Sequence, residues 1–110
     1  MTLSTHVLDT ARGLPAQGVA VTLVHLVGDA RIDVASGLTD ADGRIASPFG
    51  GQLDSGWYEL SFAAGSYFAK LGTSSFYDEI PIRFRIDAEV KHYHVPLLLA
   101  PWAYSTYRGS

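Results

Sequence analysis

The sequence predicts an all-β protein, a two-sheet antiparallel β-sandwich with one short helix. Short runs rich in β-branched and aromatic residues recur between turns that contain Gly, Pro and Asp. Within several runs, apolar and polar residues alternate with the two-residue period of a strand. Of the 110 residues, 47% are hydrophobic and only 17% are charged, which gives enough apolar material for a core. We therefore expect a single domain spanning residues 1–110.

The N-terminal half contains three predicted strands. The first, 3–10, ends at the turn residues of 12–15, which include Gly and Pro. The second, 18–27, is apolar on both of its alternating faces, so we expect both faces to be covered. The third, 31–39, follows a Gly-Asp turn and ends at the tight turn 40–43.

The C-terminal half contains four more strands. In the segment 57–63, Trp57, Glu59 and Ser61 would lie on one face and Tyr58, Leu60 and Phe62 on the other. The segment 80–86 alternates Ile and Phe with Pro and Arg, which predicts one solvated face. Residues 92–99 and 103–107 complete the set. Strands at the edges of two such sheets favour pairing with another copy, which would put an active site at a subunit interface.

The segment 66–71 is the predicted helix. Ser66 can cap its N-terminus, and Gly72 can end it. Two of its aromatic residues, Tyr67 and Phe68, can pack against the sheets. The helix has two turns at most.

Composition argues against several classes of function. The net charge is −3 and no basic run is present, so we expect no nucleic-acid partner and no anionic membrane surface as a partner. No apolar run approaches the roughly 18 residues that span a bilayer, and no secretory leader is recognisable, so we expect a cytoplasmic protein. The chain has no cysteine, which removes disulfides and Cys-based metal sites.

Histidines are the first candidates for chemistry. His92 and His94 are two residues apart and would face the same side of a strand. If the first and the penultimate strands are neighbours, His6 could join them on one sheet face. Three interpretations are open: a zinc site, a general acid and base, or polar residues on a solvated face.

Two arginines bear on this choice. Arg44 directly follows a turn, and Arg108 lies close to the C-terminus. Cations near a histidine discourage zinc binding and lower the pKa of the imidazole, which favours acid–base chemistry. The last residues alternate like a strand up to Arg108, so we expect an ordered tail in which Tyr107 and Arg108 present polar groups.

Four segments carry a family resemblance: LSTHVLDTARGLPA (3–16), TDADGR (39–44), FYDEIPIRFRI (76–86) and HYHVPLLLAPWAYSTYRGS (92–110). With them the chain resembles, essentially from end to end, the transthyretin-related family of 5-hydroxyisourate hydrolases. The terminal YRGS is the specific marker, because transthyretin, the thyroid-hormone carrier of the same fold, lacks it. The resemblance implies one transthyretin-like (prealbumin-like) domain and a homotetramer, a dimer of dimers, with sites where subunits meet.

The resemblance also implies the site residues, position by position. It gives His6, Arg44 and His94 as catalytic residues, and Tyr107, Arg108, Gly109 and Ser110 as substrate-binding residues. His92 matches the first His of HYH and is a possible secondary site residue. Ala100 and Ala103 stand where members of the family commonly have Ser or another small residue, a small departure that leaves the chemistry intact.

The implied reaction is the hydrolysis of 5-hydroxyisourate to 2-oxo-4-hydroxy-4-carboxy-5-ureidoimidazoline in urate degradation, with no metal and no organic cofactor. We expect histidine-assisted attack of water, with arginines binding the substrate oxygens and the oxyanion. The alternative is a transthyretin-like carrier that binds a small molecule without turning it over. The polar residues His6, Arg44 and His94 and the YRGS tail argue against a carrier of apolar hormones.

Overall fold

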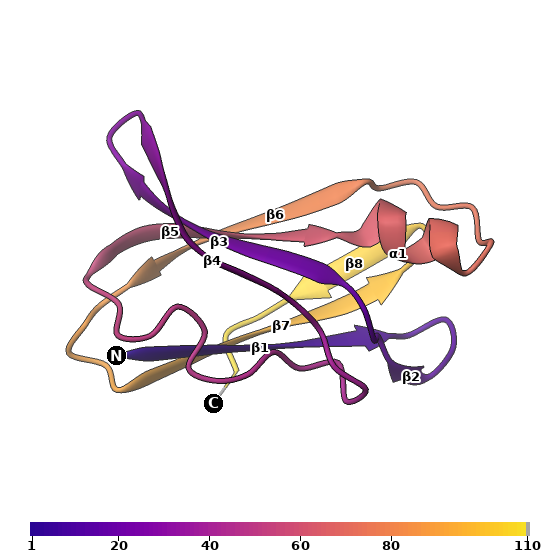
Figure 1. Cartoon of the computed structure of the whole chain (residues 1–110), viewed down its shortest axis with the longest axis horizontal. Helices are drawn as coiled ribbons and strands as arrows, with labels where there is room; N and C mark the ends of the chain where they lie inside the picture. The colour runs from indigo at the N-terminus through magenta and orange to yellow at the C-terminus, as the bar shows by residue number, and fades with distance from the viewer. Residues whose placement is uncertain (110) are drawn as a thin grey trace.

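The computed structural model describes residues 1–109, which form eight strands and one helix. In chain order these are β1 (Thr2–Asp9), β2 (Leu14–Pro15), β3 (Ala20–Val27), β4 (Ala30–Leu38), β5 (Gly56–Ala63), α1 (Ala64–Lys70), β6 (Glu79–Ile86), β7 (His92–Ala100) and β8 (Ala103–Thr106). Within this part of the chain, two four-stranded sheets have the orders β2-β1-β7-β8 and β4-β3-β5-β6, and they face each other as a sandwich (Figure 1). The predicted fold class is confirmed.

One strand pair differs from the expectation of purely antiparallel sheets. β1 and β7 run parallel, with Ser4 opposite His94 and Thr5 opposite Val95. The prediction of antiparallel pairing is wrong here, because no tight turn joins these strands; they come from opposite ends of the chain. The other strand pairs of the two sheets are antiparallel.

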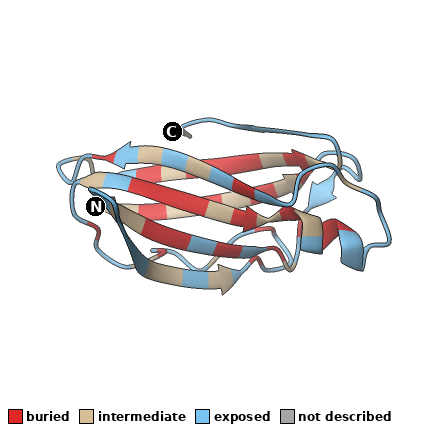
Figure 2. Ribbon diagram, turned by 90° about the horizontal axis from the view of Figure 1, so that it is seen from above, coloured by how far each residue is buried: buried red, intermediate tan, exposed pale blue. Residues whose placement is uncertain are grey.

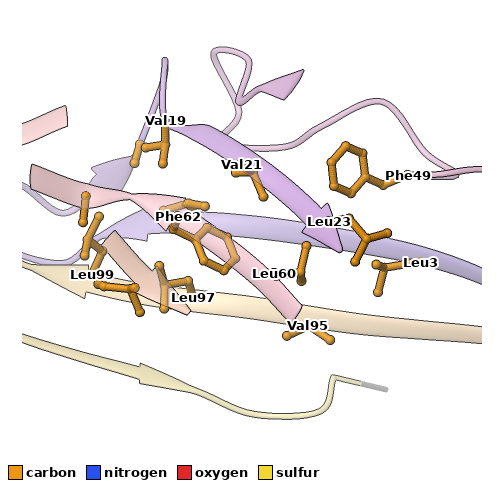
Figure 3. Close-up of a cluster of buried hydrophobic side chains, with 14 of the residues drawn as sticks. Leu3, Val19, Val21, Leu23, Phe49, Leu60, Phe62, Val95, Leu97 and Leu99 are labelled. Atoms are coloured by element: carbon orange, nitrogen blue, oxygen red, sulfur yellow. The ribbon is translucent and has the colours of Figure 1, made fainter. Parts of the chain in front are cut away.

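Alternating burial along the strands builds the core. In β1 every second side chain is buried, and Figure 2 shows the same alternation along neighbouring strands. Large apolar side chains of both sheets meet between the layers, as the close-up shows (Figure 3). They include Leu3, Val21, Leu23, Leu60, Phe62, Leu97 and Leu99. The side chains on the other side of β1 and β7 therefore point away from the core.

The helix begins earlier than predicted. β5 runs directly into α1, so Ala63 is the N-cap, no side chain caps the helix, and Ser66 lies inside it. The predicted end is correct: Gly72 has a φ of +69°, and the N–H groups of Gly72 and Thr73 donate to the carbonyls of Ala69 and Phe68. This is the Schellman arrangement, which favours glycine. Within the described residues, no helix is long and apolar enough to cross a membrane.

The helix is joined to β1 by a buried carboxylate. Asp9, only 1% exposed, accepts a hydrogen bond of 2.7 Å from the Tyr67 hydroxyl and one of 3.1 Å from the Arg12 backbone N–H. A buried carboxylate is costly unless its oxygens are hydrogen-bonded. This pair therefore holds α1 against the end of the sheet that contains β1.

Tyr67→Phe tests this contact. It leaves one oxygen of Asp9 without its donor, which should lower the free energy of unfolding by about 1–3 kcal/mol. Urea denaturation at one fixed protein concentration measures the loss, since subunit association would also affect stability. Tyr104→Phe, on a partly exposed tyrosine of β8, is the control and should change little. Equal stability of Tyr67→Phe and the parent protein would contradict this role.

Candidate active site

Three histidines lie on the outer face of the sheet that contains β1 and β7. The register pairs Thr2 with His92 and Ser4 with His94, and His6 follows two residues later on β1. The sequence placed His6 with His92 and His94 only if the first and the penultimate strands are neighbours, and β1 and β7 are paired. All three imidazoles are outside the buried core, on the face opposite Leu3 and Tyr93.

Ser4 connects two of the imidazoles. Its Oγ lies 2.8 Å from Nδ1 of His94 and 2.9 Å from Nε2 of His92. The second ring nitrogen of His92, Nδ1, is 2.6 Å from Oγ1 of Thr2. Ser4 and Thr2 were not among the predicted site residues. The signal was available, since both residues alternate with the buried positions of the first strand and so share the face of His6.

His6 is held by a turn from elsewhere in the chain. Its Nε2 lies 2.7 Å from the carbonyl oxygen of Asp42, and because a carbonyl only accepts, Nε2 carries the proton. Neutral His6 therefore has its lone pair on Nδ1. The backbone of Arg44 pairs with that of His6, so this turn brings Arg44 beside the imidazoles.

Asp40 and Gly43 shape this turn. Oδ1 of Asp40 accepts hydrogen bonds from the N–H groups of Asp42 and Arg44, at 2.9 and 3.0 Å. Gly43 has a φ of +76°, and a Cβ at this position would collide with the carbonyl oxygen of Val7. Glycine is required here for both its conformation and its closeness to β1. The tight turn predicted at 40–43 agrees with this geometry.

The C-terminal tail reaches the site through its backbone. The N–H of Gly109 donates to the carbonyl of His94 at 2.7 Å, and a Cβ on Gly109 would lie 2.6 Å from Cδ2 of that imidazole. Glycine thus lets the tail pack directly against the His94 ring. Tyr107 is exposed, and Ser110 lies outside the described residues.

Arg108 is not brought to the imidazoles. Its guanidinium carbon lies 4.7 Å from the centroid of the Tyr93 ring, a cation–π contact on the opposite face of β7. A cavity of about 240 Å³ is found on this side, lined by Tyr93, Tyr107 and Arg108 together with residues of β6. It does not include His6 or His94.

The surroundings of His94 favour its neutral form. Burial lowers the pKa of His94 below its ordinary value, and the positive charge of Arg44 lowers it further. His6 and His92 act in the same direction when they are protonated. At neutral pH, His94 therefore holds a free lone pair on one ring nitrogen, as a general base requires.

A metal site finds little support in this arrangement. Among residues 1–109, no group of three or more His, Asp or Glu side chains is arranged to hold a metal ion. Both nitrogens of His92 and Nδ1 of His94 are hydrogen-bonded to hydroxyls. The neighbouring Arg44 also disfavours a dication. Of the interpretations left open by the sequence, acid–base chemistry fits this geometry best.

Fold and site together define a transthyretin-like sandwich with a polar, histidine-bearing sheet face. The model of the HIUase/Transthyretin family matches residues 3–109, and the chain belongs to this family, as the resemblance predicted. A 5-hydroxyisourate hydrolase of Mesorhizobium japonicum is 50% identical over 114 residues, which cover 98% of this chain and 91% of the relative.

Solved structures of a 5-hydroxyisourate hydrolase and of a transthyretin are both similar to the structure of this chain. The 5-hydroxyisourate hydrolase of Klebsiella pneumoniae superimposes with a TM-score of 0.88 at 42% identity, over 100% of each chain. Sea bream transthyretin in complex with thyroxine gives a TM-score of 0.92 at 29% identity, over 99% of this chain and 95% of that one. Because the backbone is shared, the side chains of the site must distinguish the two functions.

The electrostatic effect of Arg44 can be measured directly. In an NMR titration we expect the pKa of His94 below the ordinary histidine value of about 6.5. Arg44→Gln removes a positive charge that favours the neutral imidazole, so the pKa of His94 should rise. Arg85→Gln is the control, because Arg85 lies over Trp57 on the other sheet. An unchanged His94 pKa in Arg44→Gln would contradict this electrostatic coupling.

Proposed function

We propose that this protein hydrolyses 5-hydroxyisourate to 2-oxo-4-hydroxy-4-carboxy-5-ureidoimidazoline, a ring-opening step of urate degradation. The observation that carries the proposal is that His6 and His94 lie on one face of the β1–β7 pair, with the backbone of Arg44 paired to His6 and its charge acting on His94. It is supported by relatives named 5-hydroxyisourate hydrolase that match almost the full length of the chain. The reaction class is the hydrolysis of a cyclic amide.

In the proposed mechanism His94 is the general base. Its neutral imidazole takes a proton from water, and the water oxygen forms a bond to the ring carbonyl carbon. The ring C–N bond then breaks, and a proton returns to the leaving nitrogen, so that one water is added across the bond. General acid–base catalysis of this kind contributes roughly 10²- to 10⁴-fold to the rate. His6, with its lone pair on Nδ1, orients the water or supplies a second proton-transfer group.

Arginine and the tail bind the substrate in this proposal. Arg44 stabilises the oxyanion that forms when water adds to the carbonyl. The heterocycle of the substrate contacts Tyr107, Gly109 and Ser110, and its oxygens bind Arg108. For this role the Arg108 guanidinium has to leave the Tyr93 ring, and an exposed cation–π contact is worth only about 0.5–1 kcal/mol.

A homotetramer, a dimer of dimers in the cytoplasm, completes the proposal. Two features support assembly: β8 is an edge strand whose four residues are all exposed, and Phe76 and Trp102 stack on each other while being 67% and 66% exposed. The histidine face of one chain is open to its surroundings. A second subunit facing it would form the closed, water-poor site that hydrolysis needs.

The alternative function is a transthyretin-like carrier. The observation that favours it is the similarity to sea bream transthyretin, whose structure contains thyroxine. The imidazoles of His6 and His94 and the guanidinium of Arg44 do not suit the binding face of a carrier of an apolar hormone. Unpaired polar groups oppose the burial of an apolar ligand. Turnover of 5-hydroxyisourate distinguishes the two functions.

The first test of the enzyme is loss of the proposed base. When 5-hydroxyisourate is generated from urate in situ, its decay in ultraviolet absorbance should be strongly accelerated by the parent protein. His94→Asn should reduce kcat by at least about tenfold, because it removes the general base. His25→Asn is the matched control, since His25 stacks on Tyr58 in the other sheet. Near-normal turnover by a folded His94→Asn variant would remove His94 from the mechanism.

The second test concerns metal. Because the proposed chemistry uses only imidazole and guanidinium groups, exhaustive treatment with a chelator should leave the rate of decay of 5-hydroxyisourate unchanged. The assay is run before and after dialysis against chelator, and again after zinc is added back. Activity that is lost with the chelator and restored by zinc would favour the metal interpretation of the histidines.

A further inference from the structure

A chain of hydrogen bonds leads from His94 to the end of the sheet. It runs from Nδ1 of His94 to Oγ of Ser4, on to Nε2 of His92, across that ring, and from Nδ1 of His92 to Oγ1 of Thr2. Thr2 Oγ1 lies 3.5 Å from the carbonyl of Lys91. His94 is half-buried whereas His92 is exposed, so the chain leads from the site toward solvent.

With both imidazoles neutral, the number of protons permits two arrangements of this chain. The Ser4 hydroxyl has one proton, so it donates to one imidazole and must accept from the other. In the first arrangement, His94 donates from Nδ1 to Ser4, Ser4 donates to His92, and His92 donates to Thr2. In the second, every donor and acceptor is exchanged. Only the first leaves the lone pair of neutral His94 on Nε2, which has no hydrogen-bond partner among residues 1–109.

Transfer of one proton converts the first arrangement into the second. His94 accepts a proton at Nε2 and releases its Nδ1 proton to Ser4, whose own proton moves to Nε2 of His92. His92 then passes its Nδ1 proton to Thr2, and a proton leaves Thr2 for water. One proton enters and one leaves, no bond between heavy atoms changes, and both imidazoles are neutral at this point. When the ring C–N bond breaks, Nε2 of His94 gives its proton to the leaving nitrogen, and the chain returns to the first arrangement as Thr2 takes up a proton from water. No oxidant, reductant or metal is needed.

We infer that Ser4 and His92 are positioning residues that set the tautomer of His94 and pass on the proton it takes from the attacking water. The inference deepens the proposed hydrolysis and rests on it. Its physical reason is the charge around His94: an imidazolium there would face Arg44, with His6 and His92 as further titratable neighbours. Passing the proton on avoids a second positive charge beside Arg44.

The test uses the hydroxyl of Ser4 and the ring of His92. Ser4→Ala should lower kcat for 5-hydroxyisourate by about 10- to 100-fold, by analogy with the loss of a group that orients a metal-bound imidazole. KM should stay within about twofold, because Ser4 does not touch the substrate in this scheme. Ser4→Thr keeps the hydroxyl and should restore kcat to within about threefold. Ser61→Ala, on a strand of the other sheet, is the matched control and should leave kcat unchanged.

A second variant separates proton transfer from a structural effect. His92→Ala should lower kcat similarly, and imidazole added to the buffer should restore part of the rate in a saturable manner, because it can accept the proton from Ser4. The ring ¹⁵N chemical shifts report the tautomer of neutral His94. The Nδ1–H tautomer should predominate in the parent protein, and its fraction should fall in Ser4→Ala. These readouts do not depend on global stability.

The outcomes are distinguishable. If the parent protein is active and Ser4→Ala keeps kcat within threefold, the relay is wrong while the proposed function stands. If His92→Ala loses activity that imidazole does not restore and the His94 tautomer is unchanged in Ser4→Ala, the relay is also wrong. An inactive parent protein overturns the proposed function, and the relay with it.

Discussion

The parallel pairing of β1 with β7 is the constraint on which the site depends. Its register places Ser4 opposite His94 on the outer face, and the same register places Thr5 opposite Val95 and Val7 opposite Leu97 on the buried face. A slip of β7 by one residue would turn its apolar side chains to the outside and its histidines into the core. Packing between the sheets therefore fixes the hydrogen-bonded geometry on the other side of the same strands.

Local patterns in the sequence predicted much of this arrangement. Alternation placed His92 and His94 on one side of a strand and His6 on one side of another, and each main strand was found within a few residues of its ends. Which strands are neighbours, and in which direction, depends on contacts between residues about 90 positions apart, such as Ser4 and His94. Local periodicity carries no information about such pairing, and for that reason the parallel ladder and the bridging role of Ser4 emerged only from the structure.

In the C-terminal tail, too, the local sequence pattern did not predict which residues pair. Its sequence predicted an ordered segment in which Arg108 presents its polar group, and the family resemblance gave Arg108 a substrate-binding role. The structure pairs the backbone of Gly109 with that of His94, and alternation then directs Arg108 to the face of Tyr93. Residue types alone could not supply this register. The predicted cap at Ser66 failed for a related reason, because β5 continues into α1 without a loop in which a capping serine could lie.

In the proposed mechanism, the availability of the base His94 is balanced against its strength. Burial and the charge of Arg44 keep His94 neutral, so its lone pair is available at neutral pH, but the same effects make it a weaker base. A weak base holds an incoming proton poorly unless that proton moves on. The Ser4 hydroxyl, which contacts His94, and the His92 imidazole and Thr2 hydroxyl beyond it would offer such a path. Transthyretin shares this sandwich, so in the proposed function the polar groups on one sheet face and their hydrogen bonds, and not the backbone, would account for turnover.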